Sequence, residues 1–447
     1  MKRRPEAGST AVLTRPAPTA ALAPAAQVDG SNATRTSAGS VADRRRLALE
    51  RMHGGPGHGP ETRAGRRQPR VRSTDRPGVW DVQHGPAPVA YYVIGIVVAV
   101  FVMLGLVMVL SASAAVESAK GNSPFHIFNR QVTWAGIGLI GMLVGARMHL
   151  TWVRRLAIPL VVLAGIGMAL PFVPGVGSTL NDARAWVTIG SFSVQPSEFL
   201  KLALVVFAAD LLVRRQEELS DVRRSLRPIA IVATCAAGAC LAQGDLGSAI
   251  VMCAIVLSVA FIGGVPLSPM LATAMAAGIA ALGFVFSTEY RYDRFTAFLD
   301  ITGHRDRLSY QTYQGFLSIA DGGLTGSGVG AGNGKLGYLP LAHSDFIFAV
   351  IADELGLVGS VAVVGGFMLL SWFGIQAALA APDRFGMLLA GGITTWFGVQ
   401  AVINLGGVTG LMPVTGLTLP FFSAGGSSLF VSMTAAGLLL NVARRAT

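Results

Sequence analysis

The stretch FLDITGHRDRLSYQTYQG, residues 298–315, concentrates charge between two apolar segments of this 447-residue chain. It carries two carboxylates, Asp300 and Asp306, and a carboxylate placed beside a hydroxyl group can act as a general base. Ionisable side chains at the ends of long apolar segments are costly to keep there, so a functional role is their first interpretation. We therefore treat Asp300 and Asp306 as candidate catalytic residues.

A second polar group lies in STLNDARAWVTIGSFSVQPSEFLKLALVV, which contains Arg184, Gln195, Glu198 and Lys201. Glu198 and Lys201 are three residues apart, so on a helix they share one face, with the acid toward the N-terminus where the helix dipole favours it. Two interpretations stay open. The pair either ties this helix to a neighbour or faces a substrate.

Further carboxylates interrupt the apolar segments downstream. Asp245, in LAQGDLGSAI, could cap the helix that follows it. In LPLAHSDFIFAVIADELGLVG, His343 and Asp345 begin an apolar segment, and Asp353 and Glu354 lie more than two turns inside it. Two adjacent carboxylates at that depth cannot both face lipid. We expect Glu354 to meet a cation or a polar cavity.

The glycine run DGGLTGSGVGAGNGKLG does not match a nucleotide-binding loop, because Leu336 follows Lys335 and Val329 replaces the first glycine. Lys335 could still contact a lipid pyrophosphate. Near the C-terminus, TLPFFSAGGSS places Ser423 and Ser427 in a loop expected to dip toward a cavity. No metal-ligand spacing or Ser/His/Asp constellation is present.

Composition identifies the elements that must position these residues. The chain is 52% hydrophobic and 13% charged, and its mean hydropathy is +0.56, which is typical of a membrane protein. Long Leu/Val/Ala/Gly runs without alternation favour an all-α polytopic bundle over a β-barrel. About ten spans are expected, at Tyr91–Leu110, Gln131–Ala146, Trp152–Val173, Phe199–Val213, Pro228–Ala242, Ser248–Gly264, Pro269–Ser287, Phe346–Phe373, Met387–Leu405 and Ser427–Val442.

Loop arginines predict the orientation of these spans. They gather after the second, fourth and last spans, at Arg147, Arg154, Arg155, Arg214, Arg215, Arg223, Arg224, Arg227, Arg444 and Arg445. Cytoplasmic loops carry such an excess of basic residues. Both termini are therefore expected to be cytoplasmic, and the large loop between the seventh and eighth spans is expected to be extracytoplasmic.

Residues 1–88 form a region of a different kind, and residues 89–447 form the membrane domain. The first region holds Lys2 and fourteen arginines against seven acids, which gives +8 of the overall net charge of +11. It is rich in Pro, Gly, Ala, Ser and Thr, so we expect a disordered basic tail. Attraction to anionic inner-leaflet lipid is the first interpretation, protein docking the second. No folded motif supports nucleic-acid binding.

Several of these motifs, in this order, resemble the SEDS (shape, elongation, division and sporulation) family of membrane glycosyltransferases. The resemblance covers about Ala90–Arg445 and rests on the segments NDARAWV, QPSEFLKLALV, QGDLGSAI, YQTYQGFLSIADGGLTGSGVG, LPLAHSDFIFAVIADELGLVG and GLMPVTGLTLPFFSAGGSS. The last segment and the long basic tail resemble the FtsW division branch of high-GC Gram-positive bacteria more than the RodA elongation branch.

The resemblance implies polymerisation of lipid II into glycan strands, with inversion and release of undecaprenyl pyrophosphate. Tyr310 and Gln311 align with the family's catalytic-loop motif and make Asp306 the expected general base, with Asp300 as the alternative. Arg184, Lys201 and Lys335 are the candidate cations for the pyrophosphate, with a divalent ion such as Mg²⁺ or Mn²⁺ as a further candidate. The other expected substrate-binding residues are Gln195, Glu198, Asp245, Tyr310, Gln311, His343, Asp345, Glu354, Ser423 and Ser427.

The family also implies partners and a location. A class B penicillin-binding protein would crosslink the new strand, and other division proteins would assemble with the pair in the bacterial cell membrane at the septum. Two alternatives from other classes stay open. One is a lipid II flippase or transporter, which a bundle with buried charges also suits. The other is a scaffold that recruits a transpeptidase.

Overall fold

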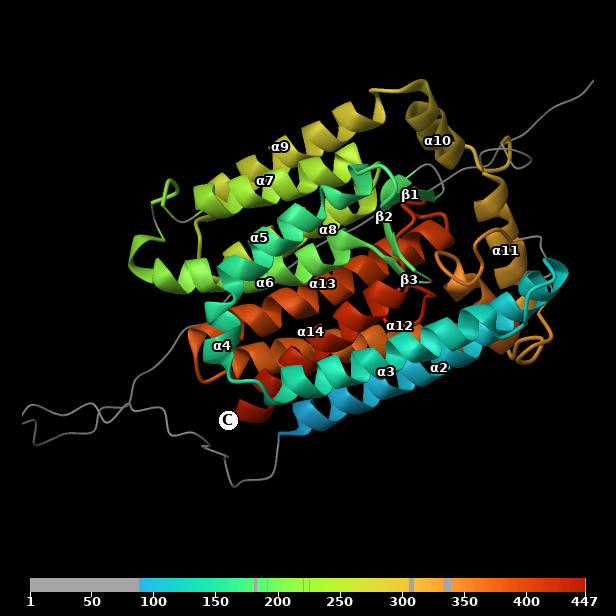
Figure 1. Cartoon of the computed structure of the whole chain (residues 1–447), viewed down its shortest axis with the longest axis horizontal. Coiled ribbons are helices and arrows are strands. Elements are labelled where there is room, and N and C mark those ends of the chain that lie inside the picture. The colour runs from blue at the N-terminus through green and yellow to red at the C-terminus, as the bar shows by residue number, and fades with distance from the viewer. Residues whose placement is uncertain are drawn as a thin grey trace, which may run out of the picture. The chain divides into compact units, whose positions relative to one another are not determined.

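The computed structural model describes residues 88–446 except 181–182, 191, 220, 225, 305–308 and 333–338. These residues are mostly helical (Figure 1). The long helices are α2 (Val89–Ala119), α3 (His126–Arg147), α5 (Ala157–Gly167), α6 (Pro196–Arg214), α7 (Leu226–Ala242), α8 (Leu246–Ile262), α9 (Leu267–Val285), α12 (Ile347–Leu379), α13 (Arg384–Val408) and α14 (Gly426–Arg445). The shorter ones are α4 (Leu150–Arg155), η1 (Leu170–Phe172), η2 (Gln216–Glu218), α10 (Glu289–Leu299) and α11 (Tyr310–Gly322).

Six described helices are long and apolar enough to cross a membrane: α2, α3, α9, α12, α13 and α14. Three further apolar helices, α5 with η1, α7 and α8, are shorter. The predicted class, a helical multi-pass membrane protein, is therefore confirmed, whereas the count of ten spans stays a prediction. The predicted basic tail, apart from Pro88, lies outside the described residues.

Helices α12, α13 and α14 form the buried centre, with α3 along α14 and α2 beside α12 (Figure 1). Small residues allow α3 and α14 to approach closely. A Cβ atom on Gly145 would lie 2.9 Å from the carbonyl oxygen of Thr434, and one on Gly437 would collide with the backbone of Met142. Gly141 and Gly145, four residues apart on α3, therefore allow close packing against α14.

A three-stranded antiparallel sheet corrects the all-helical prediction. Its strands are β1 (Gly177–Leu180), β2 (Ala183–Ile189) and β3 (Phe192–Val194), in the order β1-β2-β3. Each strand is short, so the period-two pattern covers too few residues to stand out in a long apolar chain. The N–H of Arg184 donates to the carbonyl of Gln243, which joins β2 to the turn between α7 and α8 (2.9 Å).

Helix α12 is broken near its start. Gly356 has φ +67° and ψ −159°, a conformation open to glycine but strained for other residues. The segment after α11 fills the break: the N–H groups of Ser327 and Gly328 donate to the carbonyls of Asp353 and Glu354, and the N–H of Leu357 donates to the carbonyl of Gly323. Backbone groups freed by the break are thus satisfied.

Candidate active site

The centre of the candidate site is a buried ion pair on the first two turns of α6. The ammonium of Lys201 lies 2.8 Å from Oε1 of Glu198, and the two side chains are 0% and 2% exposed. The two residues therefore lie on one face of α6, as their spacing predicts. Because the pair is buried, it fits a role in tying α6 to a neighbouring helix better than a role facing a substrate.

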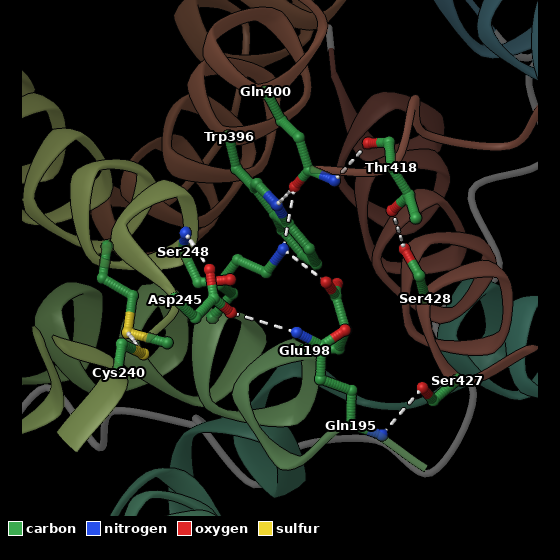
Figure 2. Close-up of polar contacts among 12 residues, drawn as sticks. Gln195, Glu198, Cys240, Asp245, Ser248, Trp396, Gln400, Thr418, Ser427 and Ser428 are labelled. Atoms are coloured by element: carbon green, nitrogen blue, oxygen red, sulfur yellow. Dashed lines mark hydrogen bonds and ion pairs between the residues drawn. The ribbon is translucent and has the colours of Figure 1, made fainter. Parts of the chain in front are cut away.

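The neighbour is α13, which contributes Trp396 and Gln400 (Figure 2). Oε1 of Gln400 accepts hydrogen bonds from Nζ of Lys201 (2.9 Å) and Nε1 of Trp396 (2.7 Å), and its Nε2 donates to the carbonyl of Thr418 (2.8 Å). The ammonium also lies 5.5 Å from the centre of the Trp396 ring. Lys201 therefore joins α6 to α13, and Gln400 extends the connection to the loop before α14.

Oε2 of Glu198 is buried and accepts no hydrogen bond from any described residue. A buried carboxylate oxygen without a donor costs free energy. This oxygen is thus a point at which the network can accept one more donor.

Asp245 joins the α7–α8 turn to the start of α6. Its Oδ1 accepts from the N–H of Ser248 (2.8 Å), which caps α8 and confirms the capping interpretation. Its Oδ2 accepts from Nε2 of Gln195 (3.0 Å), and the N–H of Gln195 donates to the hydroxyl of Ser427 at the start of α14 (3.1 Å). Gln195, Asp245 and Ser427 are therefore brought together, as Figure 2 shows.

A second polar group joins the loop before α12 to the loop before α14. The hydroxyl of Ser423 donates to the carbonyl of Ser344 (2.7 Å) and accepts from the N–H of Leu419 (2.8 Å). The N–H of Ala424 donates to the carbonyl of His343 (2.8 Å). Ser423 thus fixes loop geometry through backbone groups.

Both loops contain strained backbone. Leu341 and Phe421 have φ of +52° and +70°, and no other non-glycine residue in the described part of the chain has positive φ. Such strain persists only where the surroundings enforce it, and it is frequent at functional sites.

Asp345 is held between these loops. Burial raises the pKa of its carboxyl to about 7, against the opposing effect of the Ser344 hydroxyl. Nδ2 of Asn404 donates to the carbonyls of Asp345 (2.9 Å) and Leu417 (2.7 Å). Because both amide hydrogens point at carbonyl oxygens, Oδ1 of Asn404 must face the other way, where no described donor meets it.

Glu354 occupies the first half of α12 and is fully buried. Its carboxylate accepts from the hydroxyl of Ser111 on α2 (2.6 Å) and from the N–H of Gly330 (2.9 Å). The expected polar surrounding is therefore present. It includes a backbone N–H of the glycine run, so this run binds a carboxylate of its own chain.

Of the candidate residues between α9 and α12, the structure describes Asp300 but not Asp306 or Lys335. Asp300 ends α10, and its Oδ1 accepts from the N–H of Gly303 (2.9 Å) and the hydroxyl of Thr302 (3.2 Å). These two bonds, first that of Gly303, hold the pKa of Asp300 below its ordinary value. Asp306 and Lys335 lie outside the described residues.

Three other predicted residues are not buried: Tyr310 and Gln311 are half-buried, and Arg184 is exposed. Tyr310 and Gln311 begin α11, and Nε2 of Gln311 donates to the carbonyl of Pro340 (3.1 Å). The guanidinium of Arg184 donates from Nε to the carbonyl of Pro171 (3.0 Å) and lies over the ring of Phe172. Arg184 therefore binds its own chain in this structure.

Sequence reasoning missed Trp396, Gln400 and Asn404. They follow a spacing of four along α13, so they lie on one face of the helix. Polar residues at that spacing in the apolar segment TTWFGVQAVINLGG were the available signal.

An apolar cavity of about 570 Å³ lies between α8, α12 and α13 and reaches the loop before α14. Its lining includes Leu246, Ile375, Val402 and Pro413. It suits hydrocarbon better than sugar. Within the described ranges no three His, Cys, Asp or Glu side chains gather to hold a metal ion.

Comparison with known proteins gives one family. A family model described as a cell cycle protein of the FtsW, RodA and SpoVE type matches residues 91–447. The probable peptidoglycan glycosyltransferase FtsW of Mycobacterium tuberculosis is 38% identical over 388 residues, which cover 86% of this chain and 73% of that protein. Stage V sporulation protein E of Bacillus subtilis is 37% identical over 350 residues, which cover 78% of this chain and 95% of that protein.

Solved structures agree. A peptidoglycan synthase complex studied for the coordination of polymerization and crosslinking contains a chain that is 32% identical, with a TM-score of 0.65, covering 79% of this chain and 97% of that one. The rod shape determining protein RodA of Thermus thermophilus is 30% identical, with a TM-score of 0.57, covering 78% of this chain and 95% of that one.

Proposed function

Because this chain belongs to the FtsW, RodA and SpoVE family of cell cycle proteins, we propose that it is an FtsW-type peptidoglycan glycosyltransferase. It polymerises lipid II into glycan strands during cell division and releases undecaprenyl pyrophosphate. The observation that carries the proposal is the similarity to FtsW proteins named as glycosyltransferases over most of the chain.

The chemistry needs one carboxylate. The 4-hydroxyl group of one lipid-linked disaccharide attacks the anomeric carbon of another, and displacement with inversion forms no covalent intermediate, so a single general base suffices. We assign this role to Asp306. Asp300 is the weaker candidate because its Oδ1 already accepts two hydrogen bonds within its own loop.

The enclosed network holds the loops around the reacting sugars. Lys201 is fully buried and Glu198 nearly so, so neither can reach a pyrophosphate through solvent, and their proposed role is to fix α6 against α13. Arg184 and Lys335, both predicted from the sequence, remain the proposed cations for the pyrophosphate. Polar groups fixed in advance stabilise developing charge without reorganisation.

We further propose that ten helices cross the membrane, namely α2, α3, α5, α6, α7, α8, α9, α12, α13 and α14. Both termini are then cytoplasmic and the loop containing α10 and α11 is extracytoplasmic. Support comes from the cytoplasmic ends assigned by loop charge, where buried Asp210 accepts from both Arg154 (2.6 Å) and Arg214 (2.7 Å).

The proposed partner is a class B penicillin-binding protein, by analogy with the similar chain in a complex that couples polymerization to crosslinking. Other division proteins are proposed partners at the septum. For the basic tail we propose anionic lipid, and no nucleic acid.

A second candidate has a specific observation behind it. The sporulation protein of Bacillus subtilis is about as similar as the FtsW proteins, so a polymerase of another branch, including the RodA elongation branch, is the alternative. Localisation of a fluorescent fusion in growing cells tests the branch. Signal at the septum supports division, and signal along the lateral wall or at the pole contradicts it.

The activity itself is tested with purified protein, lipid II and, where required, the cognate penicillin-binding protein. We expect glycan polymers on a gel. The flippase alternative predicts the opposite pattern, with transfer of lipid II across sealed vesicles and no polymer. The scaffold alternative predicts neither activity.

A further inference from the structure

The outer ends of α2 and α3 carry exposed cations beside the candidate site. Lys120 follows α2, and Arg130 lies on the second turn of α3, four residues after His126 and therefore on the same face. The side chain of Lys120 is 58% exposed, and Arg130 is exposed as well.

Hydrogen bonds place this corner of the molecule against the site loops. Nε2 of Gln131, the residue after Arg130, donates to the carbonyl of Ser423 (3.0 Å). The next residue, Ala424, donates its N–H to the carbonyl of His343 (2.8 Å). These two bonds place the start of α3 next to the loop that carries His343. Burial lowers the pKa of His343, and the positive charges of Lys120 and Arg130 lower it further, against the opposing effect of Glu117.

The two cations differ in what they already bind. Lys120 pairs with Glu117 (3.1 Å), a buried carboxylate that also accepts from Asn122 (3.0 Å). The guanidinium of Arg130 has neither an ion pair nor a hydrogen bond with the part of the chain that the structure describes. An exposed guanidinium without a carboxylate partner is suited to bidentate binding of phosphate oxygens.

The proposed reaction needs such a group. Its leaving group is a pyrophosphate, and of the cations proposed for it Arg184 also donates to a backbone carbonyl, Lys201 is enclosed, and Lys335 lies outside the described residues. We propose that Arg130, supported by Lys120, forms an anion subsite beside His343 that binds the pyrophosphate of a lipid-linked sugar. The identity of the lipid in this inference rests on the proposed function. The binding of a pyrophosphate by Arg130 and Lys120 does not depend on that function.

The test compares Arg130→Gln and Arg130→Lys in the purified full-length protein. With lipid II as substrate, we expect Arg130→Gln to raise KM by roughly 10–100-fold, because one or two charge-assisted hydrogen bonds are lost. Arg130→Lys should recover part of the loss. Arg291→Gln is the matched control, since Arg291 is a cation of the outer loop on α10 and should leave KM unchanged.

Direct binding separates this inference from the proposed function. Wild-type protein and Arg130→Gln are titrated with undecaprenyl pyrophosphate and, separately, with phosphatidylglycerol in detergent micelles. Weaker binding of undecaprenyl pyrophosphate alone supports the subsite, even if the wild type makes no polymer and the proposed function fails. Equal loss for phosphatidylglycerol overturns it in favour of a general headgroup contact. Unchanged binding and KM in an active protein also overturn it.

Discussion

Lys201 and Glu198 are two charges removed from water that neutralise each other at the centre of the candidate site. Breaking a buried pair by removing one partner leaves the other charge uncompensated, whereas replacing both partners is often nearly neutral. The pair is therefore open to a test that separates structure from chemistry.

We expect Lys201→Met to destabilise the protein by about 3–5 kcal/mol, because the carboxylate of Glu198 stays buried without its cation. The double variant Glu198→Gln, Lys201→Met should recover most of this loss. Thermal melting in detergent measures both. A Lys201→Met protein that melts like the wild type would show that Glu198 does not depend on this cation.

Asp345 links stability to pH. Its pKa is about 7 in the folded protein against an ordinary value of 3.8, so between these values the folded state holds more protons than the unfolded chain. The free energy of unfolding must then fall as pH rises from about 4 to about 7. The contribution of Asp345 to stability is fully present only below the ordinary pKa of 3.8. Asp345 as a whole residue is half-buried, so the full effect is an upper limit.

Asp345→Asn removes this pH dependence. We expect the variant to match the wild type near pH 4 and to be more stable at pH 8, by at most about 4 kcal/mol. Melting temperatures at several pH values give the difference. A gap between the two proteins that stays constant from pH 5 to pH 8 would contradict the assignment.

At the scale of a single element, the break in α12 at Gly356 is the feature that affects the position of site residues. The turns before the break carry Glu354, which accepts from the hydroxyl of Ser111 on α2 and from the N–H of Gly330 in the glycine run. A Cβ atom on Gly356 would lie 2.6 Å from the carbonyl oxygen of Leu324, in addition to the strain of its positive φ.

Gly356→Ala should therefore lower stability by at least about 1–3 kcal/mol, the cost of the strained backbone alone. Gly365→Ala is the matched control in the same helix, since a Cβ atom there would meet nothing within 4 Å. We expect the control to melt at or slightly above the wild-type temperature. Equal melting temperatures of the two variants would mean that the backbone conformation at Gly356 does not contribute to stability.

Some elements were readable from the sequence and others were not. The long helices follow from apolar runs, and the Asp245 cap and the Glu198–Lys201 face follow from local spacing. The sheet, the break at Gly356 and the role of Gln400 depend on contacts between distant segments. No local pattern specifies that Gln400 meets both Lys201 and Thr418.

For the molecule as a whole, family membership and the geometry of the structure both support the proposed glycosyltransferase function. The family match supplies the chemistry, and the structure supplies a network from α6 through α13 to the loops before α12 and α14. Asp306, the proposed base, lies outside the described residues, and substitution of this residue tests its role.

The most direct measurement is the rate of glycan polymerisation from lipid II by the wild type, Asp306→Ala and Asp300→Ala, each with the cognate penicillin-binding protein and each shown to be folded by its melting temperature. Removing a general base typically costs about 10²–10⁴ in rate. We predict a loss of that size for Asp306→Ala and a far smaller one for Asp300→Ala. A folded Asp306→Ala protein that polymerises lipid II at the wild-type rate would contradict the catalytic assignment.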